Sequence, residues 1–213
     1  MGAQYRAFLS YSHRDAKWAN WLHRALETYR PPKALVGTTT AVGVVPRRLL
    51  PIFQDRQELA SATELGAVIN AALRDSARQI VICSPEAARS RWVNEEILAF
   101  KRLGREDRIF PLIVSGEPNA SSLPGRESEE CFPPALRFHL GTDGTLGDAP
   151  AEPVAADARP GKDGSFGSSP DNPNPFGDVR GRLGNIFFTI NSRMLKKPVD
   201  ATWPLTTPPP ACH

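Results

Sequence analysis

Trp92 and Glu96 are the two residues whose types and spacing most directly suggest chemistry. They belong to the segment Ser-Arg-Trp-Val-Asn-Glu-Glu-Ile, which begins at Ser90. On a helix, residues four positions apart share one face. The pair therefore presents a carboxylate beside a large aromatic ring, where the acid can be partly removed from water and the ring can stack on a planar group.

Two further segments contain polar groups of functional interest. Near the start, Ala-Phe-Leu-Ser-Tyr-Ser-His-Arg-Asp (residues 7–15) is an apolar stretch that runs into a polar turn containing Ser10 and His13. The second segment is Phe-Gln-Asp-Arg-Gln-Glu-Leu, residues 53–59. The polar residues of both segments come directly after apolar residues, so we expect them at the ends of strands.

The elements that must position these residues alternate between strands and helices. Helices are expected after two S-x-x-D/E capping patterns, at Ser12 and Ser61, and over about 86–103. The expected strands are short apolar runs, at 5–10, 49–53, 79–83 and 108–114, with a short fifth strand at 135–140. The proline within 108–114 favours a place near the sheet edge for that strand. Strands joined by single helices form right-handed crossovers and a doubly wound α/β sheet. Ligands of such sheets bind beyond the carboxyl ends of the strands, here after Ser10, Phe53 and Ser84.

Other sites known on doubly wound sheets lack their required residues. A phosphoacceptor domain needs acids after the first strand and an Asp after the third, but Ser10-Tyr11 and Ser84-Pro85 occupy those places. No G-x-G-x-x-G turn, P-loop or G-x-S-x-G nucleophile elbow is present in the sequence. A turn of hydroxyl and imidazole groups opposite a carboxylate on a helix remains.

Taken together and in this order, the three segments resemble the Toll/interleukin-1 receptor (TIR) domain family. The resemblance covers roughly residues 4–115 and extends to about 160. It implies an α/β fold, a doubly wound, flavodoxin-like parallel sheet of four to five strands with flanking helices.

The resemblance also implies an activity. Members of the family cleave the nicotinamide–ribose bond of NAD, by hydrolysis or cyclisation, with an essential Glu four residues after a Trp. In this sequence that position is Glu96 rather than Glu95. NAD is then a substrate, and neither a cofactor nor a metal is expected. The residues expected to bind NAD are those around the crevice and the adjoining loop: Ser10, His13, Phe53, Asp55, Arg56, Ser84 and Trp92.

Each of these assignments has a purely structural alternative. Glu96 can be a solvated helix residue, and Trp92 can pack against the sheet edge. Glu95 has Arg91 four residues earlier, which favours a surface ion pair. Ser12 and Asp15 read mainly as capping residues, and Asp55-Arg56 as a pair that stabilises a turn.

The family resemblance further suggests partners. Self-association through TIR–TIR contacts is expected to activate the enzyme, because in this family one subunit's loop completes the next subunit's site; other TIR proteins or a separate sensor are further candidates. The loop at 55–63 departs from the family, with Ala-Ser-Ala at 60–62 where a Pro-Gly turn is common. The main alternative is a non-catalytic TIR interaction module in signal transduction. A weaker one is an effector that imitates host TIR domains.

Composition limits the remaining possibilities. A net charge of +3 without a Lys/Arg run gives no electrostatic footprint for nucleic acid. Three cysteines are too few for a disulfide framework, and no stretch is long and apolar enough for a membrane span, so a cytoplasmic location is expected. Of the 213 residues, 1–140 are expected to form the TIR domain. A flexible Gly/Pro-rich segment (141–177), a docking helix (178–197) and a disordered tail (198–213) are expected to follow.

Overall fold

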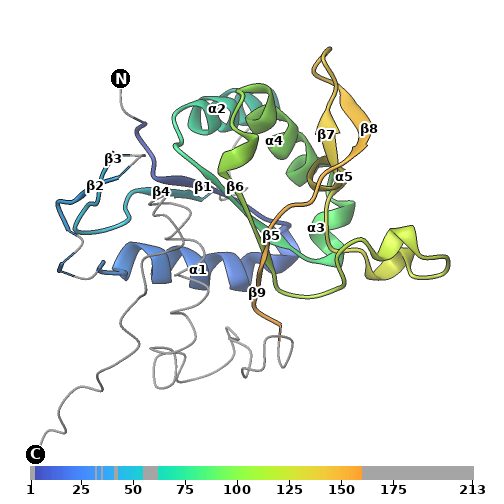
Figure 1. Ribbon diagram of the computed structural model, residues 1–213, viewed down its shortest axis with the longest axis horizontal. Coiled ribbons are helices and arrows are strands. Elements are labelled where there is room, and N and C mark those ends of the chain that lie inside the picture. The colour runs from blue at the N-terminus through green and yellow to red at the C-terminus, as the bar shows by residue number, and fades with distance from the viewer. Residues whose placement is uncertain (1–2, 32, 35, 41–42, 55–61, 160–213) are drawn as a thin grey trace, which may run out of the picture.

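A computed structural model shows a five-stranded parallel sheet with helices on both faces (Figure 1). It describes residues 3–31, 33–34, 36–40, 43–54 and 62–159. The strands are ordered β4-β1-β5-β6-β9 and every neighbouring pair runs parallel. Their bounds are β1 Ala7–Ser10, β4 Ile52–Gln54, β5 Gln79–Cys83, β6 Ile109–Ile113 and β9 Ala156–Asp157. The expected doubly wound fold is thereby confirmed.

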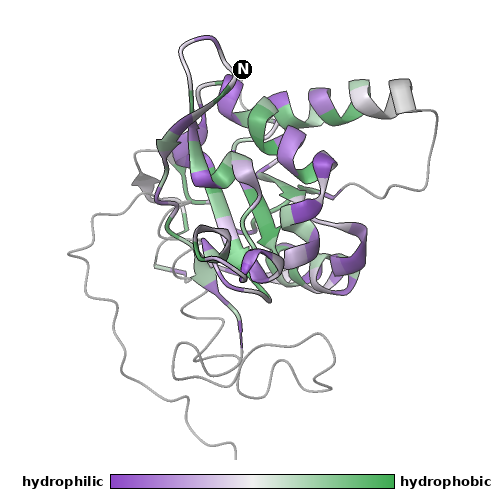
Figure 2. Ribbon diagram, turned by 90° about the vertical axis from the view of Figure 1, so that its right-hand side faces the viewer, coloured by the Kyte–Doolittle hydropathy of each residue, from purple (hydrophilic) through white to green (hydrophobic). Residues whose placement is uncertain are grey.

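Helices cover the two faces of the sheet separately. On one face lies α1 (Ala16–Thr28), and on the other lie α2 (Ala62–Arg74) and α4 (Arg91–Arg102) (Figure 1). Alternate residues of β1 point to opposite faces: Ala7 and Leu9 join the α1 core, whereas Phe8 joins the α2/α4 core. In Figure 2 the strands are coloured mainly as hydrophobic, whereas hydrophobic and hydrophilic residues alternate along the helices.

The central strand β5 is buried along its whole length, as its continuous apolar run predicts for a strand covered on both faces. Pro111 lies in β6, next to the edge strand β9, and β9 pairs only with Leu112 and Ile113. The proline therefore precedes the β6–β9 ladder. This agrees with the expectation that a strand containing proline lies near the sheet edge.

The third expected helix is two helices in the structure. α3 (Pro85–Arg89) ends at Ser90, which adopts an extended conformation, and α4 begins at the next residue. The Ser90 hydroxyl accepts a hydrogen bond from the amide of Val93, so it caps α4. A capping serine inside a continuous helical pattern explains why one helix was expected.

The region after residue 134 also differs from expectation. A fifth strand was expected at 135–140, but α5 (Pro134–Arg137) and β7 (Phe138–Leu140) occupy it, and β7 pairs antiparallel with β8 (Leu146–Pro150) outside the main sheet. The fifth strand of the main sheet is β9, within a stretch expected to be flexible. Short, mostly polar strands held by neighbouring elements give little periodicity to detect. The predictions for 160–177, 178–197 and 198–213 lie outside the described residues.

Short elements complete the chain order. They are the antiparallel pair β2 (Thr39–Thr40) and β3 (Gly43–Val44) and the 3-10 turns η1 (His13–Asp15), η2 (Glu106–Arg108), η3 (Ala120–Ser122) and η4 (Glu127–Glu129). Within the described part of the chain, no helix combines the length and apolar composition needed to cross a bilayer.

Candidate active site in the groove between two helices

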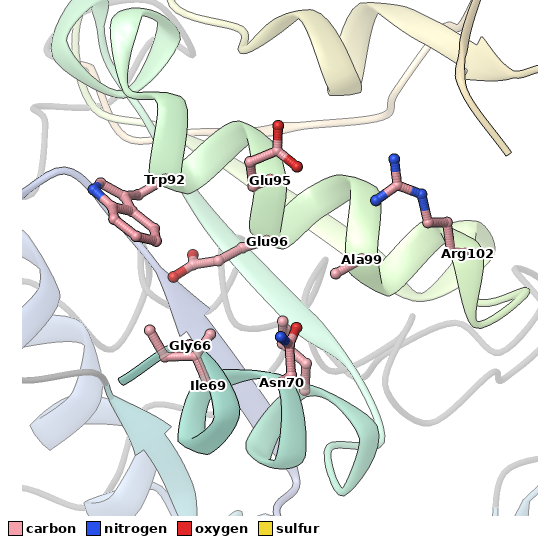
Figure 3. A pocket seen from close by; sticks show the side chains of 9 residues that line it. Gly66, Ile69, Asn70, Trp92, Glu95, Glu96, Ala99 and Arg102 are labelled. Atoms are coloured by element: carbon pink, nitrogen blue, oxygen red, sulfur yellow. The ribbon is translucent and has the colours of Figure 1, made fainter. Parts of the chain in front are cut away.

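A groove of about 230 Å³ lies between α2 and α4 and contains the Trp92–Glu96 pair. Helix α2 supplies Gly66, Ile69, Asn70 and Leu73, and α4 supplies Trp92, Glu95, Glu96, Ala99 and Arg102. Figure 3 shows Trp92 and Glu96 on the side of α4 that faces Gly66 and Ile69, as expected for residues one turn apart. The predicted pairing of the acid and the aromatic ring on one helix face is present in the structure.

Glu96 is withdrawn from solvent although its helix is amphipathic and lies on the surface. Its exposed fraction is 9%, whereas the neighbouring Glu95 is exposed and points away from α2 in Figure 3. The apolar neighbours Val93 and Ile97 fix this orientation, because both are buried against the sheet. A carboxylate held in such surroundings interacts more strongly with a nearby positive charge than it would in water.

Trp92 contributes an accessible aromatic surface at the opening of the groove. Its side chain is 52% exposed, which is unusual for a large apolar residue. It therefore does not pack wholly against the sheet. The ring face can stack on a planar or cationic group that enters beside Glu96.

The interpretation of Glu95 as half of an ion pair is not reproduced. Among the ion pairs of the described residues, none joins Arg91 to Glu95. Both side chains are exposed, and exposed i,i+4 pairs contribute only a few tenths of a kcal/mol at best. Glu95 therefore lines the rim of the groove with an exposed side chain, one position away from the buried Glu96.

The hydroxyl groups at the strand ends have a different environment. Ser10 is 1% exposed and its Oγ accepts a hydrogen bond of 2.8 Å from Gln79 Nε2. Ser84 is also 1% exposed; its Oγ donates to Asp15 Oδ2 at 2.6 Å and accepts from the Ala87 amide at 3.0 Å. Contact between either hydroxyl and a substrate would require these internal bonds to break.

Four other predicted residues fall in three places. His13 lies in η1, the turn after β1, and is exposed. Phe53 is half-buried in β4, with its ring stacked on Phe8 at 5.1 Å between ring centroids. Asp55 and Arg56 lie outside the described residues. Of the described residues expected to bind NAD, only Trp92 lines the groove.

The serine and aspartate expected to cap the first helix do not do so. Neither Ser12 nor Asp15 makes a side-chain capping bond to the turn or helix that it precedes. Asp15 instead accepts the hydrogen bond from Ser84, across the ends of β1 and β5. Burial raises the pKa of Asp15 above its usual range, and the nearby Glu86 adds to this, while the bond from Ser84 and the neighbouring His13 act in the opposite direction.

Sequence reasoning missed the α2 wall of the groove. Gly66 and Asn70 lie one turn apart on α2 and face α4, but neither residue type carries a signal for a site. Only the packing of α2 against α4 brings them beside Glu96.

The two cysteines in the described part of the chain are poorly suited to act as nucleophiles. Cys83 and Cys131 are fully buried; burial raises the pKa of the Cys131 thiol to about 12 and that of Cys83 well above its usual range. A cysteine acts as a nucleophile in its ionised, thiolate form. The raised pKa values disfavour that form in both residues at neutral pH. No group of three or more His, Cys, Asp or Glu side chains that could hold a metal occurs among these residues.

Comparison with known proteins gives three findings. Residues 8–113 match the family model for the TIR-like domain of the Thoeris protein ThsB. The NAD(+) hydrolase ApTIR of Actinoplanes sp. is 33% identical over 149 residues, which is 66% of this chain; the chain spans 18% of the length of that relative. The TIR domains of the activated Roq1 resistosome that recognises the effector XopQ match with a TM-score of 0.38 and 19% identity, over 56% of this chain and 62% of that one.

The family match coincides with the part of the fold just described. It begins in β1, ends in β6 and includes the α2–α4 groove with Trp92 and Glu96. This chain therefore carries a TIR domain of the bacterial type.

Proposed function

We propose that this chain cleaves the nicotinamide–ribose bond of NAD, with Glu96 as the catalytic carboxylate. One observation carries the proposal: a glutamate on a surface helix is almost fully buried in a groove, one turn from an exposed tryptophan. The relative from Actinoplanes, named as an NAD hydrolase, supports the same reaction for this chain.

The proposed chemistry requires little beyond a positioned negative charge. When the bond breaks, its electron pair leaves with nicotinamide, which departs neutral because it was cationic in NAD. Positive charge then develops on ribose C1′ and the ring oxygen, as in glycoside cleavage. The Glu96 carboxylate stabilises this charge until water, or a nucleophilic atom of the same NAD molecule, attacks C1′.

Trp92 would stack on the cationic nicotinamide ring before cleavage. The attraction between a cation and an aromatic face disappears when nicotinamide leaves as a neutral molecule. The exposed His13, in the turn after β1, remains a proposed contact for the phosphate or ribose. We do not assign such contacts to the hydroxyls of Ser10 and Ser84, because both are buried and bonded internally.

The described residues form a groove that is too small to enclose the whole substrate. Its volume of about 230 Å³ is below the range of about 300–1,000 Å³ that is usual for small-molecule sites. It can accept the nicotinamide–ribose end of NAD and leave the adenosine part outside. This supports a site completed by self-association, in which a second copy covers the remainder of the nucleotide.

The same observation favours the alternative function, a non-catalytic TIR module that signals through protein contacts. An incomplete groove with an exposed tryptophan would then be a contact surface. Release of nicotinamide separates the two: purified protein is incubated with NAD, with and without a crowding agent that promotes clustering. Nicotinamide that accumulates faster under crowding supports the enzyme and its activation by assembly. No release under either condition would favour the interaction module.

A further inference from the structure

The Asp15 carboxylate has a role that its position at the start of a helix does not explain. Asp15 stands at the N-cap position of α1, yet it makes no side-chain bond to that helix. Its Oδ2 instead accepts a hydrogen bond of 2.6 Å from the hydroxyl of Ser84, a residue 69 positions later. That distance lies in the range of charge-assisted bonds between a hydroxyl and a carboxylate. Asp15 therefore ties the turn after β1 to the end of β5.

Ser84 passes this connection to the helix that follows. It is the N-cap of α3, and its Oγ accepts a hydrogen bond from the Ala87 amide at 3.0 Å while it donates to Asp15. One hydroxyl thus links Asp15 to the first turn of α3. Because Ser84 is 1% exposed, water does not readily replace either bond.

Helix α3 continues into the helix that carries Glu96 through a single residue. The Ser90 amide bonds to the Ala87 carbonyl at the end of α3, and the Ser90 hydroxyl caps the amide of Val93 at the start of α4. Glu96 lies six residues beyond Ser90, about 9 Å along the helix axis. A shift of α3 would accordingly move the start of α4 and the side chains that face the groove.

The charges around Asp15 add only a weak second connection. Arg14, in the same turn, pairs with Glu86 of α3 at 3.3 Å, but the arginine is 65% exposed, and such pairs stabilise little. His13 of the turn and Glu86 are the other charged groups that act on Asp15. The partly buried Asp15–Ser84 bond is the stronger connection between β1 and α3.

We propose that Asp15 is a positioning residue for Glu96, acting through Ser84 and α3. The inference rests on the proposed NAD cleavage for its catalytic consequence. Catalysis by a single carboxylate depends on where that carboxylate stands, and displacement by about 1 Å can lower a rate by up to about 100-fold. Asp15 touches no substrate in this account; it holds the helix that does.

The test compares three substitutions of Asp15. Asp15→Ala removes the acceptor; Asp15→Asn keeps an oxygen acceptor without the charge; Asp15→Glu keeps the charge but lengthens the side chain by one methylene. We expect kcat for nicotinamide release to fall about tenfold in the alanine and glutamate variants and about twofold in the asparagine variant. Asp148→Ala, on the exposed strand β8, is the matched control and keeps the wild-type rate.

The relative activities of the three variants distinguish a positioning role of Asp15 from an effect of its charge alone and from a failure to fold. Equal activity of folded Asp15→Ala and wild type would overturn the proposal, as would full activity of Asp15→Glu, since charge alone would then suffice. If the alanine variant does not fold, the asparagine and glutamate variants still decide the matter.

Hydrogen exchange supplies a readout that does not depend on catalysis. We expect the Ala87 and Val93 amides to exchange at least about fivefold faster in Asp15→Glu than in the wild type, because their capping bonds loosen. A wild-type protein that releases no nicotinamide would refute the proposed function alone. Unchanged exchange of both amides in Asp15→Glu would refute the proposed connection from Asp15 through Ser84 and α3 to α4.

Discussion

Two polar regions of this domain were expected to form one site, and the structure gives them opposite environments. At the carboxyl ends of β1 and β5, Ser10 and Ser84 are buried and their hydroxyls bond to Gln79 and Asp15. In the α2–α4 groove, Glu96 is buried beside the exposed Trp92 and the space between the helices is open. Polar groups in the first region hold elements together, whereas those in the second face an opening where a ligand can bind.

The comparison predicts that substitutions in the groove reduce activity directly. Substitutions at the strand ends should reduce stability, and they should affect activity only through the position of α4. Both regions contain buried polar side chains, so burial alone does not distinguish them. What distinguishes them is whether the side chain borders a space that a substrate can enter.

The largest expected effect is that of Glu96→Ala on NAD cleavage. We expect the rate of nicotinamide release to fall by about 100- to 10,000-fold, the range for loss of a positioned catalytic group. Circular dichroism and thermal unfolding should show a folded protein. Glu152→Ala, at an exposed glutamate outside the groove, is the control and should keep the wild-type activity. A folded Glu96→Ala protein with the wild-type rate would end the assignment.

At the strand ends, Ser84→Ala should lower the free energy of unfolding by about 1–2 kcal/mol. The substitution removes the N-cap of α3 and leaves the partly buried Asp15 without its hydroxyl donor. Chemical denaturation measures the loss. Ser84→Thr, which keeps a hydroxyl, should recover part of it. An unchanged free energy of unfolding in Ser84→Ala would mean that the two hydrogen bonds of the Ser84 hydroxyl make no net contribution to stability.

Trp92→Ala should have a smaller effect, visible in substrate binding rather than in stability. Because the ring is half-exposed, the free energy of unfolding should change by less than about 0.5 kcal/mol. The KM for NAD should rise about two- to fivefold, which corresponds to an exposed cation–aromatic contact of about 0.5–1 kcal/mol. Leu123→Ala, at a similarly exposed apolar residue, is the control. A large loss of stability would instead mark Trp92 as a packing residue.

The smallest expected effect is on the pH dependence of stability. The pKa of Asp15 is raised in the folded protein, so its contribution to stability is full below the unfolded pKa and is lost as pH rises through the folded pKa. The asparagine of Asp15→Asn does not ionise, so this variant does not lose stability in that way. Its free energy of unfolding should therefore rise relative to that of the wild type between acidic and neutral pH. Denaturation curves across that interval measure the difference.

Asp143→Asn provides a control of opposite sign. Hydrogen bonds from the Thr145 amide and hydroxyl lower the pKa of Asp143, so its contribution is present above the unfolded pKa and is lost as pH falls. The asparagine variant should therefore lose stability relative to the wild type as pH rises. The same sign for both variants would contradict the role of burial at Asp15.

Much of the sheet and one side of the site could be predicted from local pattern. The continuous apolar run at 79–83 predicted β5 with its observed bounds, and the spacing of Trp92 and Glu96 placed both on one helix face. The break at Ser90 was hidden because the helical pattern continues through this capping serine. The short strands β8 and β9 could not be predicted, since each depends on pairing with another strand. The role of Asp15 was misjudged because its partner Ser84 lies 69 residues away.

By itself, the sequence determined the alternation of strands and helices, the parallel sheet and the turn of helix that unites an acid with an aromatic ring. These follow from periodicity and residue type, which act over a few positions. Tertiary structure alone decided which polar groups face an open space and which bond to one another. The physical reason is that burial and hydrogen bonding depend on which elements pack against each other. Helix α2 packs against α4 and leaves a groove beside Glu96. At the ends of β1 and β5, the Asp15 carboxylate instead accepts a hydrogen bond from Ser84.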